Sequence, residues 1–307
     1  MSSIIQVNGL TKNYGSHRGI IDVTFEISEG EVFGFLGPNG AGKTTTMRTL
    51  MGLLRPTTGQ ASIAGLDCWS QATEIKKLIG YLPGEFNFDP GLRGAQIIEY
   101  LGHLRGGVDQ TYLRKLVERL GFDPSKRFRE YSHGNKQKLG LVQAFMHKPR
   151  VLILDEPTSG LDPLNQQEFY TMVGEMRAEG RTVFLSSHIL PEVEHTCSRV
   201  AIIREGRLVK TDHVSALKEI RRHDVEISFP GPASVEWFKN VASVVSVAQG
   251  ADEHTLQLNI QGELTEIIHI ASQHSATNIA TREPSLEEVF LRFYEPKQVS
   301  SALAGER

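Results

Sequence analysis

Gly37-Pro38-Asn39-Gly40-Ala41-Gly42-Lys43-Thr44-Thr45 is the stretch that decides the fold, because it satisfies the pattern G-x-x-x-x-G-K-[ST] directly after an apolar strand pattern at 32–36. Its glycines let the backbone curl so that consecutive N–H groups point at phosphate oxygens, and the helix that follows adds its positive N-terminal end. Elsewhere such a stretch would be a glycine-rich turn with an incidental lysine; between a strand and a helix it predicts a nucleotide phosphate site. The residues expected to bind the nucleotide here are Gly37, Asn39, Gly40, Gly42, Lys43, Thr44 and Thr45.

A second motif, Val151-Leu152-Ile153-Leu154-Asp155-Glu156-Pro157, is an apolar strand that ends in two carboxylates. Alone it would indicate a core strand with a solvated end, but beside a phosphate loop it acquires a role. Lys43 is expected to neutralise the β- and γ-phosphates, while Thr44 and Asp155 hold Mg²⁺. Glu156 is then placed to polarise or deprotonate the attacking water, because a carboxylate that neutralises a metal is a poor base.

The composition excludes several classes of protein. A length of 307 residues is typical of two globular units, and 33 Lys and Arg against 36 Asp and Glu leave a formal charge of −3, without the basic excess that drives nucleic-acid binding. Nucleic acid is therefore not expected as a partner. No stretch reaches the roughly 20 apolar residues of a membrane-spanning helix, and residues 1–8 lack a leader pattern. The two cysteines, Cys68 and Cys197, have no metal-ligand spacing, so we expect a protein of the reducing cytoplasm.

Hydrophobic periodicity divides the first two thirds of the chain into strands and helices. Apolar positions three or four residues apart between 95 and 120 predict an α-helical insertion. Beyond 150, strands and helices alternate, which favours parallel strands with helices on their faces. A hairpin turn at 204–207 and a closing helix at 214–220 follow. The predicted strands are 4–7, 20–27, 32–36, 62–64, 79–82, 151–154, 183–186 and 200–203, and the later helices are 135–146, 164–178 and 191–197.

The charged stretch 218–224 marks a domain boundary, because the pattern after it is complete in itself. Its order of β-α-β-β-α-β is that of a ferredoxin-like domain, and an amphipathic helix at 286–293 follows it. The predicted elements are strand 225–229, helix 233–240, strands 244–247 and 255–260, helix 264–273 and strand 276–281. The predicted domains are 1–220, with an α-helical subdomain at about 85–147, then 221–295, and a flexible tail at 296–307.

Tyr131-Ser132-His133-Gly134-Asn135-Lys136-Gln137 precedes the acidic strand by some 20 residues. In position and partly in residues it resembles the signature motif, usually Leu-Ser-Gly-Gly-Gln, of the ATP-binding subunits of ABC transporters, and the likeness covers roughly residues 4–220. The resemblance implies that Ser132 and Gly134 touch the γ-phosphate of an ATP held by the opposite subunit. From the residues alone, Ser132 is a good N-cap for the helix that follows, whose N-terminal end favours an anion.

Three further positions follow the order of motifs in that family. Ser159-Gly160-Leu161-Asp162 resembles the D-loop, which places Asp162 at the nucleotide, and His188 after a strand resembles the switch histidine that senses the γ-phosphate. Tyr14 falls where the family stacks an aromatic ring on adenine. Together with Lys43 and Glu156, His188 completes the set of residues expected to take part in catalysis.

Two residues depart from the family pattern. His133 replaces the usual glycine of the signature, which would carry strain of about 1 kcal/mol or more if that position required a positive φ. Beside the γ-phosphate its imidazole could instead assist. Gly84 stands where the family has the glutamine that contacts Mg²⁺ and relays the nucleotide state to the membrane partner. We expect Glu85, the next residue, to bind at the nucleotide site and take over part of that function.

Phe86, Phe88 and Leu92 are apolar residues in a stretch otherwise rich in glycine and proline. One interpretation is local core packing. The other is a groove wall that receives a short helix from the membrane subunit, which is how the family couples ATPase to permease.

The resemblance implies a fold and a function. The fold class is α/β: a P-loop NTPase of the ABC type with a mixed core sheet, an antiparallel β subdomain and an α-helical subdomain, followed by a small α+β ferredoxin-like domain. The function is that of an ATPase, with ATP and Mg²⁺ as ligands, that pairs head to tail with a twin or a related subunit. It would power a separate transmembrane permease, peripheral on the cytoplasmic face of the membrane. The ending at 283–291 resembles ATPase subunits of ABC-2-type exporters, which favours export over import. The alternative is an ATP-dependent sensor whose C-terminal domain binds a small ligand.

Overall fold

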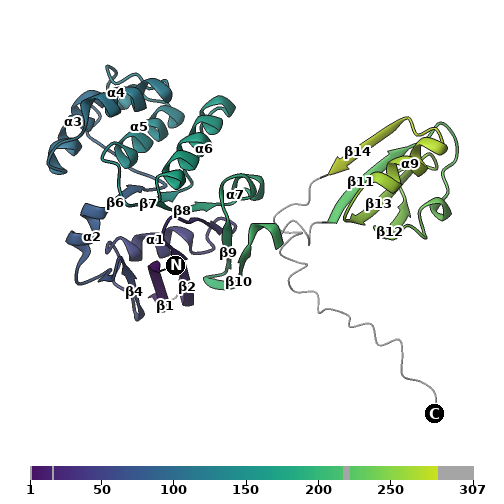
Figure 1. The fold of residues 1–307 in the computed structure, drawn as a ribbon, viewed down its shortest axis with the longest axis horizontal. Helices are drawn as coiled ribbons and strands as arrows, with labels where there is room; N and C mark the ends of the chain where they lie inside the picture. The colour runs from purple at the N-terminus through teal and green to yellow at the C-terminus, as the bar shows by residue number, and fades with distance from the viewer. Residues whose placement is uncertain (1, 16, 217–221, 283–307) are drawn as a thin grey trace, which may run out of the picture. The chain divides into compact units, whose positions relative to one another are not determined.

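The computed structural model describes residues 2–15, 17–216 and 222–282 (Figure 1). The chain divides into two compact units, Met1–Val214 and Ser215–Arg307. The predicted closing helix at 214–220 lies partly outside the described residues. The predicted helix at 286–293 lies wholly outside them. No helix in the described ranges is long and apolar enough to cross a membrane.

A mixed six-stranded sheet forms the centre of the first unit. Its order is β10-β9-β3-β8-β7-β6, and neighbouring strands run parallel except for β10, which is antiparallel to β9. β3, β7 and β8 are buried along their whole length, which explains their apolar runs. The carboxyl ends of these parallel strands therefore share one edge, where the predicted site residues gather. The strands are β3 (Val32–Leu36), β6 (Ile79–Leu82), β7 (Val151–Asp155), β8 (Thr182–Ser187), β9 (Arg199–Arg204) and β10 (Arg207–His213).

An antiparallel sheet of order β2-β1-β4-β5 packs on the central sheet through an aromatic core. Phe25 of β2 stacks on Phe33 of β3 with ring centroids 5.7 Å apart, and Phe35 and Phe184 complete the cluster. Such pairs stabilise the two layers beyond the burial of their area. The strands are β1 (Ser3–Tyr14), β2 (His17–Ser28), β4 (Thr58–Ile63) and β5 (Leu66–Asp67).

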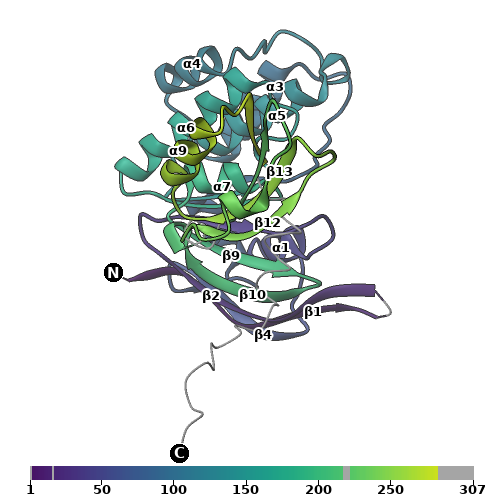
Figure 2. The same ribbon diagram turned by 90° about the vertical axis from the view of Figure 1, so that its right-hand side faces the viewer.

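The α-helical part lies at the end of the first unit away from β1, β2 and β4, as Figures 1 and 2 show for α3, α4 and α5. The insertion predicted between 95 and 120 is two helices, α3 and α4, joined by a glycine-containing turn. The helices are α1 (Lys43–Leu50), α2 (Ala72–Leu78), α3 (Gly94–Leu104), α4 (Gln110–Arg119), the 3₁₀ turn η1 (Phe128–Glu130), α5 (His133–Phe145), α6 (Pro163–Ala178) and α7 (Leu190–Thr196).

The second unit is a four-stranded antiparallel sheet with its own core. The order β12-β13-β11-β14 corresponds to second, third, first and fourth along the unit, which is the arrangement of a ferredoxin-like domain. Ile267 and Ala271 of α9 are buried against the sheet. The elements are β11 (Arg222–Ser228), η2 (Val235–Trp237), β12 (Val244–Gln249), β13 (Thr255–Gln261), α9 (Thr265–Gln273) and β14 (Asn278–Arg282).

The predicted fold class is confirmed in the mixed sheet, the antiparallel layer and the α-helical part. The helix predicted at 233–240 is wrong, since only the 3₁₀ turn η2 forms there. Pro230-Gly231-Pro232 precedes this segment. Because prolines and glycine interrupt regular structure, fewer residues are left that can form a helix. The domain limits that we predicted remain predictions.

Candidate functional site

The loop between β3 and α1 has the backbone that a phosphate site requires. Gly40 and Gly42 adopt φ of +78° and +110°, a region that L side chains rarely occupy, and Gly42 caps α1. A Cβ on Gly42 would also lie 2.7 Å from the Ile20 side chain. The loop can therefore be built only with glycine at 42, and it leaves the first N–H groups of α1 free to face an anion.

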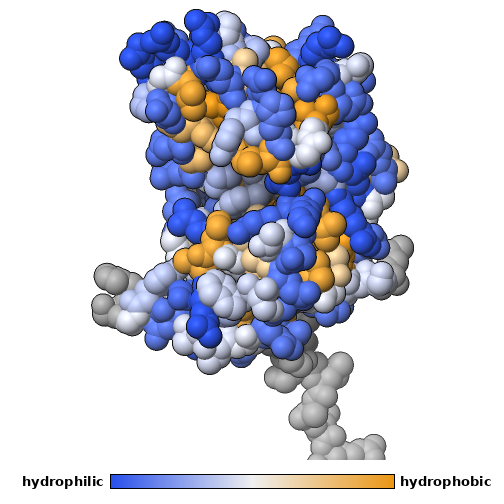
Figure 3. All heavy atoms as spheres, turned by 90° about the vertical axis from the view of Figure 1, so that its left-hand side faces the viewer, coloured by the Kyte–Doolittle hydropathy of each residue, from blue (hydrophilic) through white to orange (hydrophobic). Residues whose placement is uncertain are grey.

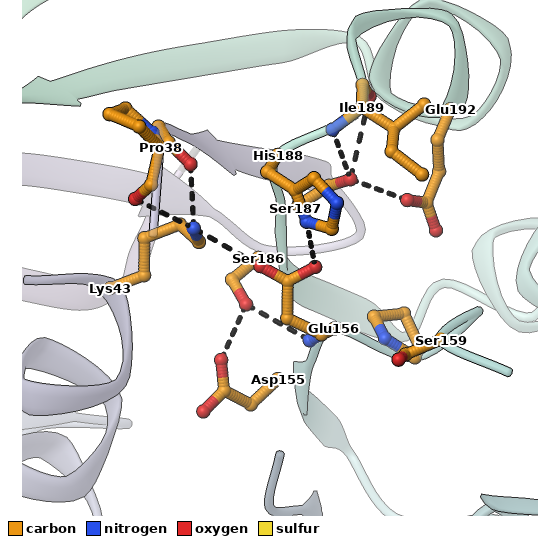
Figure 4. A network of polar contacts seen from close by, with 12 residues as sticks. Pro38, Lys43, Asp155, Glu156, Ser159, Ser186, Ser187, His188, Ile189 and Glu192 are labelled. Carbon is orange, nitrogen blue, oxygen red and sulfur yellow. Dashed lines mark hydrogen bonds and ion pairs between the residues drawn. The ribbon is translucent and has the colours of Figure 1, made fainter. Parts of the chain in front are cut away.

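Lys43 lies at the centre of a polar network in this loop (Figure 4). Its side chain is 5% exposed, and its Nζ donates to the carbonyl oxygens of Gly37 at 2.6 Å and Pro38 at 3.2 Å. Nζ also lies 3.1 Å from Glu156 Oε1. The lysine ammonium thus joins the phosphate loop to the end of β7, where the second motif ends.

Asp155 is fully buried and is held by two hydroxyl groups. Thr44 Oγ1 donates to Asp155 Oδ2 at 2.7 Å, and Ser186 Oγ donates to Asp155 Oδ1 at 2.6 Å. A carboxylate and a hydroxyl at one place are the hard oxygen ligands that Mg²⁺ prefers. The residues expected to bind Mg²⁺ are therefore side by side and chemically suited to it.

Glu156 adopts a strained backbone with φ of +51°, which is uncommon for a residue with a long side chain. Its N–H donates to Ser186 Oγ at 3.0 Å, and its carbonyl oxygen accepts from Gln137 Nε2 at 2.9 Å. These bonds hold a turn that directs the Glu156 carboxylate toward Lys43. Sequence analysis missed Ser186 and Gln137 as site residues, although Gln137 ends the quoted signature motif.

His188 follows β8 and faces the same carboxylate. His188 Nδ1 lies 2.7 Å from Glu156 Oε2, so the glutamate is held from both sides, by an imidazole and by the Lys43 ammonium (Figure 4). Behind His188, the Ser187 hydroxyl donates to Glu192 of α7. Burial raises the pKa of Glu192, whose side chain is almost wholly enclosed.

The signature residues lie against the D-loop of the same chain. Ser132 caps α5 and accepts from the Asn135 N–H at 3.3 Å, as expected from sequence. His133 begins α5 without a positive φ, so the condition under which it would carry strain is not met. Its Nε2 lies 3.3 Å from Ser159 Oγ.

The D-loop carries a glycine where the signature approaches it. Gly160 has φ of +73°, and a Cβ there would lie 2.2 Å from the His133 ring; a Cβ on Gly134 would lie 2.4 Å from the Gly160 carbonyl oxygen. Asp162 caps α6 by accepting from the Asn165 N–H at 3.0 Å, and hydrogen bonds from Asn165 lower the pKa of Asp162. In one chain, the signature motif thus meets the D-loop at His133–Ser159 and at Gly134–Gly160.

Tyr14 ends β1 with 41% of its surface exposed, and the Lys12 ammonium lies 5.4 Å from its ring centroid. A Cβ on Gly19 would lie 3.4 Å from Tyr14 Cδ2, and the next residue, Ile20, packs under the phosphate loop. The ring is therefore near that loop and open to an incoming base.

Position 84 faces the carboxylate of Asp155. A Cβ on Gly84 would lie 3.2 Å from Asp155 Oδ2, so a glutamine there would approach the residues expected to bind Mg²⁺. Glu85 is exposed, and the described part of the chain gives it no hydrogen bond or ion pair. That Glu85 replaces the glutamine remains a prediction.

An apolar groove of about 300 Å³ opens beside β6, the strand that precedes Gly84. Phe86 and Phe88 line it together with Tyr81 and Leu101, whereas Leu92 does not. Phe86 and Phe88 also pack edge to face with centroids 5.8 Å apart, so they contribute to local packing as well as to the groove wall. That the groove receives a helix of the membrane subunit remains a prediction. Figure 3 shows apolar patches on this side of the unit, separated by hydrophilic surface.

Comparisons with known proteins agree with this geometry. The family model described as ABC transporter matches residues 20–159. The chain is 33% identical to the bacitracin transport ATP-binding protein BcrA of Bacillus licheniformis, over 95% of this chain and 97% of that protein. It is 34% identical to the daunorubicin resistance ATP-binding protein DrrA2 of Streptomyces coeruleorubidus, over 94% of each. A solved ATP-binding subunit of an ABC transporter superposes with a TM-score of 0.65 at 27% identity, over 70% of this chain and 92% of that one.

Proposed function

The chain belongs to the ABC transporter ATP-binding proteins, and from that premise we propose that it powers export through a separate membrane permease. It binds and hydrolyses ATP, as its family does. The observation that carries the proposal is the convergence of Lys43 Nζ and His188 Nδ1 on the Glu156 carboxylate, at 3.1 and 2.7 Å, beside the phosphate loop.

In this proposal Glu156 is the general base. Lys43 and His188 fix the direction of its carboxylate, which accepts a proton from the attacking water. The water oxygen forms a bond to the γ-phosphorus while the bond to the bridging oxygen breaks, and its electron pair leaves on ADP. Lys43 then contacts the phosphates and offsets their charge.

Thr44 and Asp155 would hold Mg²⁺, whose positive charge offsets that of the β- and γ-phosphates. Ser186 orients the Asp155 carboxylate through its hydroxyl. Tyr14 would stack on the base, and the N–H groups from Gly40 to Thr45 would bind the phosphates.

Each chain is proposed to supply half of two sites in a head-to-tail dimer. Ser132 and Gly134 lie with Asp162 at the D-loop, and would reach the γ-phosphate bound by the twin. Leu164, two residues past Asp162, is 84% exposed, and Ile189, next to His188, is 42% exposed. A second copy would cover these apolar side chains.

We propose that a short permease helix occupies the apolar groove lined by Phe86 and Phe88. This contact would hold the subunit at the cytoplasmic face of the membrane, and closing of the ATP-bound dimer would move the helix. The names of BcrA and DrrA2 refer to bacitracin transport and daunorubicin resistance, which supports export of an antibiotic-like compound.

The test is the variant Glu156→Gln, with Glu118→Gln on the exposed face of α4 as matched control. Glu156→Gln should lower kcat by about a hundredfold or more, because the proton acceptor is lost. With ATP and Mg²⁺ it should elute as a dimer in gel filtration, whereas the control should turn over ATP like the wild type. Unchanged hydrolysis would contradict the role of Glu156. Hydrolysis without any ATP-dependent dimer would instead support the sensor alternative.

Export is tested separately in cells. Cells without the subunit should accumulate more daunorubicin or bacitracin than cells with it, and Glu156→Gln should not restore the difference. Equal accumulation of both compounds would contradict antibiotic export while leaving the ATPase assignment intact.

A further inference from the structure

A basic pocket lies beside the apolar groove in the first unit. It encloses about 790 Å³ among the C-terminal ends of α2, α3 and α5. Four of its lining side chains, Lys76, Lys77, Arg105 and Lys148, are cationic, and only Asp109 is acidic. The surplus of positive charge is unusual in a chain whose formal charge is −3.

The pocket's own residues compensate this positive charge only in part. Within the described ranges, none of the four cations forms an ion pair with a carboxylate. The Asp109 carboxylate caps α4 by accepting from the N–H groups of Thr111 and Tyr112 at 2.9 and 3.2 Å. Each of the three helix C-termini contributes about half a negative charge. Together with the Asp109 carboxylate, they offset only part of the four positive charges.

Neighbouring contacts hold two of the four cations, Arg105 and Lys148, in place. The Arg105 guanidinium donates to the Lys76 carbonyl oxygen, which joins the end of α3 to α2. The Lys148 ammonium lies 4.5 Å from the Tyr112 ring centroid. His147 also lines the pocket, and its buried Nδ1 has no hydrogen-bond partner in the described structure. Two of the four cations are therefore fixed at the pocket, and its surplus of positive charge favours a negatively charged group there.

The basic pocket is continuous with the apolar groove. Lys76 and Arg105 line both of them. Any segment that places apolar side chains on Phe86 and Phe88 therefore brings its neighbouring residues to these two cations. Charge complementarity then decides the chemistry of that segment, because like charges placed there would repel it.

We propose that the permease segment in the apolar groove carries carboxylates that pair with Lys76, Arg105 and the adjoining lysines of the basic pocket. The inference rests on the proposed function, in that it requires a permease to dock here. It adds the partner's chemistry: an amphipathic segment with apolar anchors on one side and Asp or Glu beside them.

The first experiment uses the complex purified from its native membranes. A zero-length carbodiimide joins lysine amines only to carboxylates that touch them. We expect cross-links from Lys76, Lys77 or Lys148 to Asp or Glu in a cytoplasmic loop of the membrane protein. Cross-links confined to lysines outside the pocket would overturn the inference.

The second experiment reverses the charge of the pocket. Lys77→Glu/Lys148→Glu should retain about tenfold less membrane protein per subunit, because it loses one attraction and adds a repulsion. The neutral pair Lys77→Met/Lys148→Met should lose less. Lys115→Glu/Arg177→Glu, which changes two exposed cations outside the pocket by the same charge, should retain the wild-type amount.

Folding and the proposed function are checked independently. Relieving repulsion among four cations should leave the urea midpoint of the charge-reversed variant at or above that of the wild type. If wild-type subunit carries no membrane protein at all, the proposed function fails. If wild type carries one and the charge-reversed variant carries as much, or if retention follows added anionic phospholipid without cross-links, only the partner's acidic chemistry is refuted.

Discussion

Gln137 holds the strained turn at Glu156: its side-chain amide donates to the carbonyl oxygens of Glu156 and Pro157, at 2.9 and 3.0 Å. The glutamine is 3% exposed and lies on α5, the helix that Ser132 caps. One buried side chain therefore links the signature helix to the turn that carries the carboxylate proposed as general base. A movement of α5 would therefore shift the backbone of Glu156 through this amide.

Gln137→Met keeps the volume of the side chain but removes its donor. Two buried carbonyl oxygens then lose a partner, which should lower the free energy of unfolding by about 1–3 kcal/mol. The turn should also relax from its positive φ, so kcat should fall by about tenfold or more. Urea unfolding and steady-state hydrolysis measure the two effects. Gln167→Met on the exposed face of α6 is the control; equal behaviour of both variants would mean that Gln137 does not hold the turn.

Ser186→Ala removes the hydroxyl that joins Asp155 to the Glu156 N–H. Asp155 Oδ1 loses its donor at 2.6 Å, so the carboxylate is free to rotate away from Thr44. We expect the Mg²⁺ concentration for half-maximal hydrolysis to rise by about tenfold, because residues behind metal ligands orient them. Ser198→Ala, which removes a hydroxyl bonded to the Val32 carbonyl oxygen, should leave the Mg²⁺ dependence as it is. An unchanged midpoint in Ser186→Ala would show that Asp155 needs no such support.

His147 predicts a pH dependence of stability. Burial, reinforced by the charges of Arg105 and Arg181, lowers the pKa of His147 to about 4 in the folded protein. The unfolded chain binds the proton near pH 6.5, so it takes up protons before the folded state does. Stability should therefore fall as pH falls from about 6.5 toward 4, and His147→Gln should make this part of the curve flatter.

Urea unfolding at a series of pH values measures the difference in free energy of unfolding between wild type and His147→Gln. The titration of the carboxylates is common to both proteins and cancels from this difference. His213→Gln changes an exposed histidine at the end of β10 and serves as control. Parallel curves for wild type and His147→Gln between pH 4 and 6.5 would contradict the buried, neutral state of this imidazole.

The fold and half of the site could be predicted because their signals are local. A few consecutive residues determine each of three features: the phosphate loop, the apolar strand before Asp155 and the cap at Ser132. Ser186 and Gln137 could not be found this way, since they reach Glu156 from other strands and helices. The positive φ of Glu156 is likewise imposed by these distant bonds.

Two expectations depended on a local geometry that the structure does not have. Strain at His133 was expected only if that position required a positive φ, and the structure has the positive φ at Gly160, where the His133 ring packs. The helix expected at 233–240 was part of the predicted β-α-β-β-α-β order, and the chain forms only a 3₁₀ turn there. Such an order leaves open whether a segment is long enough to nucleate a helix.

Glu85→Ala and Glu85→Ala/Gly84→Gln test whether a signal from the proposed permease reaches the residues expected to bind Mg²⁺. Gly84 faces Asp155 Oδ2 from 3.2 Å as measured from an added Cβ, whereas Glu85 is exposed on the same loop. If Glu85 takes over from the missing glutamine, Glu85→Ala should lower transport by about tenfold while ATP binding stays as it is, because only the relay is lost. Glu85→Ala/Gly84→Gln should then recover part of the transport, and Glu99→Ala on α3 should resemble the wild type. Wild-type ATPase activity and transport in Glu85→Ala would remove Glu85 from the mechanism.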